Sequence, residues 1–439
     1  MSKHNSTYKG WDVITIDNKW LTVHVAPKLG GRIIQVGLPG EELLFNNANL
    51  NGIDIETASS NDKTKWLNFG GEKIWPAPQG WDSQEQWPGP PDVILDGGFY
   101  TVCDDILTDE TSHSVRLLSE QDPYTGLQII KDITISEKTS AIHVKATFIN
   151  RSDSVKKWSI WPVIQLDTPD VSSKDRYGIV CPINADSKFE EGFYVMHGLA
   201  NCPQYAVDGF NNFQVTNKYL VGKVGLDTDA NWVAFCDKKN GNVLVATFEY
   251  DSHAVYPDGT SVQIWVQGEG LTYSRNRINR YADNPSENFP YMEIELLSPL
   301  CEMPSGNQMS FEYEIILCKI PENTSVLKKN DIGVIASSMA ITSHDNYIEV
   351  KGKYGVFSEG LLKLYFTNED QEILTTNPIV EWSVSPTQGI MLDIEIYDFP
   401  VDEDGKIGLT FKFFDLEGTY VGDLDQNSIL TRYNNYQNL

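Results

Sequence analysis

Basic residues and long apolar runs are scarce in this chain of 439 residues. Lys and Arg number 34 against 61 Asp and Glu, which gives a formal net charge of −27. Because a phosphate backbone demands clustered Lys and Arg, this balance argues against nucleic acid and anionic membrane surfaces as partners. No run of about 18 apolar residues occurs, and the N-terminal segment lacks the apolar stretch of a secretory signal. We therefore expect a cytoplasmic protein.

Clustered metal ligands are also lacking. The six cysteines are scattered without a CxxC pair, and the seven histidines show no HxH or HExxH spacing. The cysteines are therefore predicted to be reduced thiols, not a disulfide framework or a zinc site. The Gly-Gly pairs precede no helical pattern, so they are not phosphate loops. We expect no metal and no cofactor.

Aromatic residues are abundant instead. Hydrophobic residues make up 41% of the chain, aromatic residues 11%, and tryptophan alone occurs 11 times. The apolar content is sufficient for a packed core, which argues against global disorder. An acidic, tryptophan-rich globular protein suits neutral ligands with flat faces, sugars among them.

The apolar pattern has a period of two. Residues 11–17, 141–150, 242–250 and 309–317 alternate apolar with polar side chains, are rich in β-branched and aromatic residues, and are bounded by turn formers. No convincing amphipathic helix of four turns is present. The pattern predicts an all-β fold, a large antiparallel sandwich or barrel.

A domain boundary is predicted near residues 320–332, where a proline-containing turn and a polar stretch separate two β patterns. Residues 1–325 form one large β domain in this prediction. Residues 331–439 form a second, with the size of an immunoglobulin-like sandwich. The second region is denser in acid, with 18 acidic residues against 6 basic ones.

The segment 66–100 is the most unusual part of the chain. It holds Trp66, Trp75, Trp81 and Trp87 together with several prolines and two Gly-Gly pairs. Such a composition is typical of an ordered loop packed by its own side chains. One interpretation is a binding loop in which one or two indoles stack on a sugar. The other is that the tryptophans only wedge the loop onto the sheet.

Polar residues of this segment could serve such a loop. Under the binding interpretation Glu72, Lys73, Gln79 and Asp96 hydrogen-bond sugar hydroxyls. The substrate-binding residues predicted here are Lys73, Trp75, Gln79 and Trp81.

Three motifs carry a family resemblance. The run LGGRIIQVGLPGEELLF at 29–45, then FGGEKIWPAPQG at 69–80 and LDGGFY at 95–100, resembles an uncharacterised family of the galactose-mutarotase-like (aldose 1-epimerase) superfamily. The resemblance covers about residues 10–320 and leaves the tail unmatched. It implies a β-supersandwich and an enzyme that interconverts the anomers of an aldose. In such enzymes a glutamate takes the proton of the anomeric hydroxyl and a histidine protonates the ring oxygen.

The resemblance implies a glutamate base on a strand near the end of the domain, where Glu293 and Glu295 lie. Being two residues apart, they face the same side of a strand. From the residues alone, that acidic side is equally well the solvated face of the strand. The resemblance favours one of them as the catalytic base.

The superfamily's usual histidines are absent. Asp96 stands where a His-Gly-Gly turn is expected, and Gln165 lies where a strand histidine is expected. Asp96 can act as an acid only if burial raises its pKa. His197 and His253, in turn-rich segments with aromatic neighbours, are the other candidate acids, although loop histidines are more often plain surface residues. Catalysis by the superfamily's ordinary acid–base pair is therefore in question.

Further contacts are weaker candidates. Arg32, after a Gly-Gly turn, and Gln165 are predicted to contact the sugar, with an exposed strand arginine as the alternative for Arg32. The basic cluster Arg275, Arg277 and Arg280 suits an acidic sugar, a phosphorylated sugar or a partner protein, or else forms a solvated loop.

Two functional hypotheses follow. The first is an aldose 1-epimerase-like isomerase that uses a strand glutamate as base on a small carbohydrate. The second is a carbohydrate-binding protein without catalysis, which fits the missing histidines. An interaction protein built on the acidic tail is a third and vaguer option.

Overall fold

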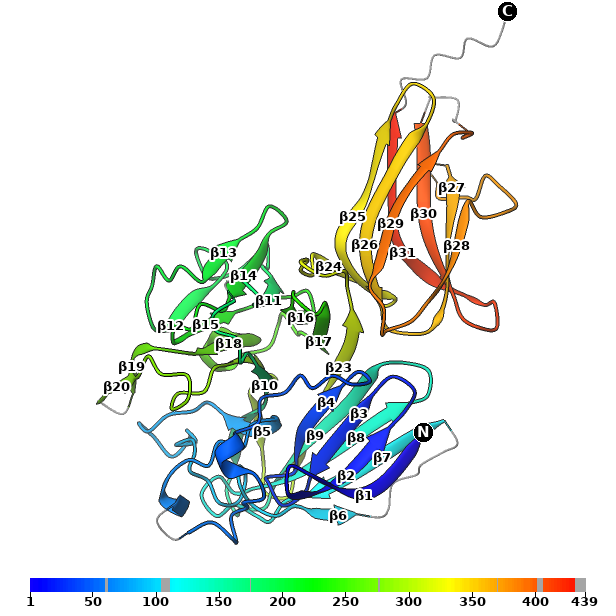
Figure 1. The fold of residues 1–439 in the computed structure, drawn as a ribbon. Helices are drawn as coiled ribbons and strands as arrows, with labels where there is room; N and C mark the ends of the chain where they lie inside the picture. Colours follow the sequence, from blue (N-terminus) through cyan, green and yellow to red (C-terminus); the bar gives the residue numbers. More distant parts are fainter. Residues whose placement is uncertain are drawn as a thin grey trace, which may run out of the picture. The chain divides into compact units, whose positions relative to one another are not determined.

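The computed structural model describes residues 1–59, 62–103, 111–173, 175–274, 277–368, 370–400 and 406–430. Within these ranges, 31 strands and three short 3-10 helices form the secondary structure (Figure 1). The helices are η1 (Ala48–Leu50), η2 (Asp62–Thr64) and η3 (Pro257–Gly259). The predicted all-β fold is confirmed. None of the helices in the described ranges has the length and apolar character needed to cross a membrane.

The chain divides into two compact units. Unit 1 comprises residues 1–137, 141–235 and 244–316, and unit 2 comprises 138–140, 236–243 and 317–439. The predicted division into domains 1–325 and 331–439 stays a prediction. All six cysteines are free thiols, four of them buried.

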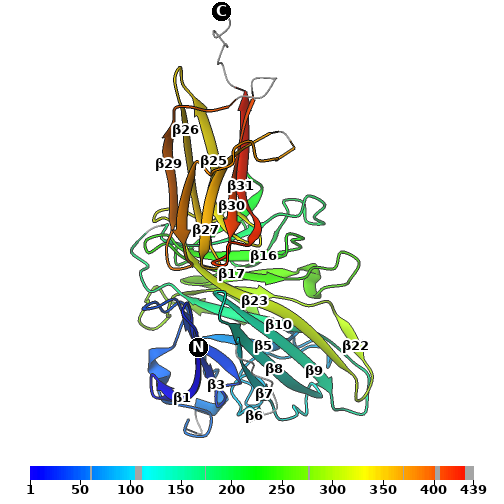
Figure 2. The ribbon, with the colours of Figure 1, turned by 90° about the vertical axis from the view of Figure 1, so that its right-hand side faces the viewer.

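Unit 1 is built largely from two wide sheets and a small hairpin, and Figure 2 shows strands of both sheets from the side. The first sheet has the order β1-β2-β3-β4-β5-β10-β21-β18-β15-β12, with β22 beside β10. Its strands are β1 (Ser2–Tyr8), β2 (Trp11–Asp17), β3 (Thr22–Ala26), β4 (Arg32–Gly37), β5 (Glu72–Ala77), β10 (Lys156–Asp167), β12 (Tyr194–His197), β15 (Gly222–Leu226), β18 (Val262–Gln267), β21 (Tyr291–Leu296) and β22 (Cys301–Met303).

The second sheet has the order β13-β14-β11-β16-β17-β23-β9-β8-β7-β6. Its strands are β6 (Thr101–Cys103), β7 (Ser112–Leu118), β8 (Leu127–Ser136), β9 (Ala141–Asn150), β11 (Tyr177–Pro182), β13 (Tyr205–Val207), β14 (Asn212–Thr216), β16 (Trp232–Asp237), β17 (Asn242–Phe248) and β23 (Gln308–Lys319). The hairpin pairs β19 (Gly270–Ser274) with β20 (Arg277–Tyr281).

Unit 2 contains two four-stranded sheets around one apolar core, which confirms the predicted small sandwich. Tyr354 and Phe411 meet edge to face in this core, with ring centroids 5.5 Å apart. One sheet contains β24 (Lys328–Lys329), β25 (Gly333–Ser343), β26 (Ile348–Val356) and β29 (Ile390–Ile396). The other contains β27 (Gly360–Thr367), β28 (Val380–Val384), β30 (Lys406–Phe414) and β31 (Tyr420–Leu430).

The register of the first sheet separates an apolar face from a functional one. Ile164 of β10 pairs with Ile294 of β21, which pairs with Ile264 of β18. All three are buried in the core. Because side chains alternate along a strand, their neighbours Glu293 and Glu295 point to the opposite face. That opposite face carries the site described below.

A buried ion pair links the two sheets of unit 1. Lys131 Nζ of β8 donates to Glu72 Oε2 of β5 at 2.5 Å, and the hydroxyl of Tyr313 on β23 donates to Glu72 Oε1 at 2.5 Å. All three side chains are buried, and burial lowers the pKa of Lys131. Glu72 therefore lies on the inner face of β5, where it cannot serve as the sugar contact that the sequence suggested.

Removing one member of this pair should destabilise unit 1. Lys131→Met leaves the Glu72 carboxylate buried without its cation, a change that typically costs about 3–5 kcal/mol. We expect a loss of that order in the free energy of unfolding, and partial recovery in Lys131→Met/Glu72→Gln. Urea unfolding followed by tryptophan fluorescence measures this loss. The signal reports mainly on unit 1, because Trp382 is the single tryptophan of unit 2.

A matched control lies on the neighbouring strand. Lys145 pairs with Glu312 at 2.7 Å, with both side chains about half exposed. Lys145→Met should cost less than about 1 kcal/mol. Equal losses in Lys131→Met and Lys145→Met would contradict a structural role for the buried pair.

Candidate functional site

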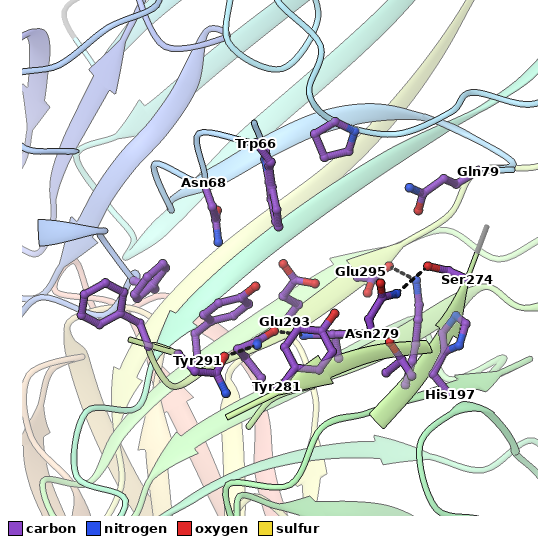
Figure 3. Close-up of a pocket in the computed structure, with 18 of the residues that line it drawn as sticks. Trp66, Asn68, Gln79, His197, Ser274, Asn279, Tyr281, Tyr291, Glu293 and Glu295 are labelled. Atoms are coloured by element: carbon purple, nitrogen blue, oxygen red, sulfur yellow. Dashed lines mark hydrogen bonds and ion pairs between the residues drawn. The ribbon is translucent and has the colours of Figure 1, made fainter. Parts of the chain in front are cut away.

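A pocket of about 540 Å³ lies over the functional face of the first sheet. We call it the tryptophan pocket (Figure 3). Its floor comes from neighbouring strands in register, with Trp75 opposite Trp161 and Glu293 opposite Trp265. Its lining includes Trp66, Asn68, Trp75, Gln79, Trp81, Trp161, His197, Lys223, Trp265, Asn279, Tyr281, Tyr291, Glu293 and Glu295.

The hairpin β19–β20 supplies one wall. Thr272, Ser274, Asn279 and Tyr281 line the pocket, and Asn279 Nδ2 donates to Ser274 Oγ at 2.8 Å. Tyr281 stands edge-on to Trp265 at 6.4 Å between ring centroids. This hairpin therefore adds polar groups to a mostly aromatic enclosure.

Glu293 and Glu295 share a strand and a face but differ in their partners. Glu295 Oε2 accepts from the indole of Trp161 at 2.9 Å and from Lys223 Nζ at 2.8 Å. Glu293 Oε1 accepts from Gln165 Nε2 at 2.7 Å. Both carboxylates are buried, so the solvated acidic face that the sequence left open is not present.

Glu293 forms its ion pair with a buried lysine. Lys73 Nζ lies 3.8 Å from Glu293 Oε1 and over the Trp75 ring at 4.5 Å. It has no hydrogen-bond partner among the described residues. Burial raises the pKa of Glu293 to about 7, and Lys73 opposes that rise. Burial likewise lowers the pKa of Lys73 to about 8, against the attraction of Glu293. The long pair thus holds a carboxyl group that titrates near neutral pH.

A second ion pair positions two of the indoles. Arg32 Nη2 lies 2.9 Å from Asp96 Oδ1, and both side chains are buried. The Asp96 carboxylate also accepts from Trp75 Nε1 at 3.0 Å and from Trp66 Nε1 at 3.1 Å. The remaining guanidinium hydrogen bonds go to carbonyl oxygens, among them that of Gly70 at 2.8 Å.

This pair corrects two predictions. Arg32 has no exposed surface, so it does not contact a ligand as predicted. The contacts of Asp96 do not fit the predicted acid, because both its oxygens already accept hydrogen bonds. Arg32 and Asp96 are positioning residues that orient Trp66 and Trp75.

The two candidate histidines lie in different surroundings. His197, on β12, lines the pocket with its ring 6.4 Å from that of Trp265. Burial lowers its pKa and Lys223 adds to the effect, so both disfavour the charged imidazolium. His253 has a side chain 95% exposed, 3.6 Å from Asp251, and is not among the described residues that line the pocket. Its contacts are those of a surface residue.

The pocket gathers most of the residues predicted from sequence. Those that line it are Trp75, Gln79, Trp81, His197, Glu293 and Glu295. Lys73 and Gln165 contact Glu293 directly. Of the four loop tryptophans, Trp87 alone is absent from the lining; it is buried against Trp75 and serves to wedge the loop. The roles predicted for these residues stay predictions.

Sequence reasoning missed several members. Trp161, Lys223 and Trp265 all line the pocket, and Lys223 stacks over the Trp161 ring at 4.8 Å. A signal existed for Trp161 and Trp265, since each lies an even number of residues from a buried glutamine, Gln165 or Gln267, and so shares a strand face with it. Lys223 carries no such signal, because its strand is short and two of its residues are glycines.

The predicted basic cluster does not form a pocket wall in the described part of the chain. Arg277 and Arg280 are exposed on β20, and Arg275 lies outside the described residues. No group of three or more potential metal ligands is found among the described residues.

Comparisons with known proteins identify the family of this chain. A family model described as Domain of unknown function (DUF4380) matches residues 12–314, and the chain belongs to this family. Among curated proteins, none matches the chain.

Several solved structures are similar to it. A galactose mutarotase-like protein from Clostridium acetobutylicum is 11% identical with a TM-score of 0.45, over 73% of this chain and 99% of that one. One from Lactobacillus casei is 13% identical with a TM-score of 0.43, over 70% and 99%. A TPR-domain containing protein from Parabacteroides distasonis is 12% identical with a TM-score of 0.43, over 70% of this chain and 47% of that one. This chain thus spans about half of the last protein, and these similarities concern the fold alone.

The raised pKa of Glu293 should make stability depend on pH. Between its ordinary value of 4.5 and about 7, the folded protein keeps the proton that the unfolded chain has lost. Unfolding then releases a proton, so the free energy of unfolding should fall as pH rises through this window. In Glu293→Gln, the part of this decrease in the free energy of unfolding that comes from the Glu293 proton should be absent. Urea unfolding at several pH values measures it.

The control is Glu302→Gln, which removes a largely exposed carboxylate. Its pH dependence should follow the wild type. The same pH dependence in Glu293→Gln as in the wild type would contradict the raised pKa.

Proposed function

We propose that unit 1 binds a carbohydrate in the tryptophan pocket and acts on its anomeric centre, in the manner of an aldose 1-epimerase, with Glu293 as general base. One observation carries the proposal. A carboxyl group with a pKa near neutrality lies at the floor of a pocket enclosed by five indoles.

The enclosure suits a sugar. Indole faces pack against the apolar C–H faces of a pyranose, while a few fixed polar groups receive its hydroxyls. Gln79, Gln267, Asn279 and Asn288 are such groups in the lining. Asp96 holds two of the indoles by their N–H groups, so these rings are preorganised before a ligand arrives.

The chemistry needs a proton to leave O1 and a proton to reach the ring oxygen. Glu293 takes the O1 proton as the C1–O5 bond breaks, which gives the open-chain aldehyde and the protonated O5 hydroxyl. A base is most effective when its pKa lies near the working pH, as that of Glu293 does. His197 is the lining imidazole that can pass a proton to O5, and reclosure on the other face of C1 reverses each transfer.

Binding without catalysis is the alternative, and two observations favour it. Glu295 Oε2 accepts from Trp161 Nε1 and from Lys223 Nζ, contacts that hold the pocket floor and offer no proton to a ligand. Burial lowers the pKa of His197, which disfavours the protonated imidazole that would deliver a proton to O5. A pocket with a base and a poor acid binds a sugar without opening its ring.

Anomer exchange separates the two. NMR exchange spectroscopy on galactose, glucose and mannose should show interconversion faster than in buffer. The rate should rise with pH through about 7, since the base form of Glu293 is required. Glu293→Gln should lower kcat/KM by about 10²–10⁴-fold, the usual contribution of a general base. Glu302→Gln should match the wild type.

Binding is measured on the same sugars by calorimetry. Trp66→Ala should weaken sugar binding whether or not the protein is catalytic, because Trp66 lines the pocket. Binding without any acceleration of anomer exchange would establish the non-catalytic alternative. No binding by any sugar tested would contradict both.

A further inference from the structure

We infer that the ligand is a neutral saccharide of at least two sugar residues, lying across the tryptophan pocket and a second pocket that continues it. The inference rests on the proposed function and specifies its substrate class. The second pocket, of about 330 Å³, is called here the side pocket and is lined by Tyr194, Met196, Gln263 and neighbouring residues.

The two pockets adjoin along a set of shared side chains. Gln79, Trp81, Trp161, His197, Lys223 and Ser274 line both. Because the same side chains face both spaces, a ligand longer than one sugar residue that follows them contacts both pockets. Trp81 is 43% exposed, so an indole face is open to a ligand beside this junction.

The side pocket extends the same sheet face. Glu295 pairs with Gln263 of β18, and Gln263 pairs with Gly225 of β15. A Cβ at Gly225 would lie 3.2 Å from the Tyr194 ring and 3.3 Å from Met196 Sδ, so these side chains pack over the bare glycine. The cross-strand pairs Glu295–Gln263 and Gln263–Gly225 therefore form a row that leads from the carboxylates of the tryptophan pocket to the Tyr194 ring of the side pocket.

Charge selects a neutral ligand. Each lysine on the floor already has a carboxyl partner, Lys73 in Glu293 and Lys223 in Glu295. Burial lowers the pKa of His197, so a positive charge is disfavoured there. The other charged residues among the described lining are acidic: Glu287 in the first pocket, and Asp82 and Asp258 in the second. A uronate or a sugar phosphate would meet repulsion there, and a neutral sugar does not.

Size favours more than one ring. The tryptophan pocket alone lies within the about 300–1,000 Å³ that holds drug-sized ligands, which exceed a single hexose. A monosaccharide in it would leave the whole side pocket, with Tyr194 and Met196, to water. A second sugar residue fills that space and buries apolar surface.

Calorimetric titrations test this with glucose, galactose, cellobiose, lactose and maltose. At least one disaccharide should bind about tenfold more tightly than either monosaccharide, a gain of about 1.4 kcal/mol. Tyr194→Ala, and independently Met196→Ala, should remove most of that gain and leave monosaccharide affinity within about twofold, because these side chains line only the side pocket. Thermal unfolding checks that each variant is folded.

The matched control is Leu199→Ala, which truncates a 63% exposed side chain two residues after β12. It should bind every sugar as the wild type does. Equal affinity for mono- and disaccharides, or equal weakening of both by Tyr194→Ala and Met196→Ala, would overturn the second subsite. Tighter binding of glucuronate or glucose 6-phosphate than of glucose would overturn the neutral ligand. If no sugar binds at all, the proposed function itself fails.

Discussion

The alternation of strand β5 is the constraint on which the rest of unit 1 depends. Glu72 and Lys73 are adjacent, so they point to opposite faces of one strand, and both are buried. Glu72 meets Lys131 of the second sheet, while Lys73 meets Glu293 at the floor of the pocket. Burying a charge on each face is costly unless each finds a partner. The register of β5 is therefore fixed by two ion pairs, and a shift by one residue would exchange their surroundings.

The same logic extends to the start of β4 and the segment that follows β5. Arg32 and Asp96, which are not among the described residues that line the pocket, form a pair there, and its carboxylate accepts the N–H groups of Trp66 and Trp75. Large aromatic side chains lose little conformational freedom when they bind, provided they are already oriented. The ion pair supplies that orientation from behind the pocket wall. Residues that resemble sugar contacts in sequence thus act by positioning the indoles.

Sequence predicted the fold class well, because period-two alternation is a local property of strands. It also found Glu293 and most of the loop side of the pocket. It could not find Lys223. This residue lies at the site because the sheet has the strand order β21-β18-β15, and that order depends on pairing between segments far apart in the sequence. It misjudged Arg32 and Asp96 for the same reason. Their mutual contact joins residues 64 positions apart in the sequence, and neither is among the described residues that line the pocket.

The two glutamates of β21 show how environment separates identical groups. Glu295 has an ammonium at 2.8 Å and an indole N–H at 2.9 Å, so its negative charge is well compensated. Glu293 has its ammonium at 3.8 Å, and desolvation prevails, which brings its pKa to about 7. The ion-pair distances differ by about 1 Å, and this separates the two carboxyl groups in function. Coulomb attraction weakens with separation, while the cost of burying the charge persists. Glu295 anchors the floor through Lys223, whereas Glu293 provides the carboxyl group that titrates near neutral pH.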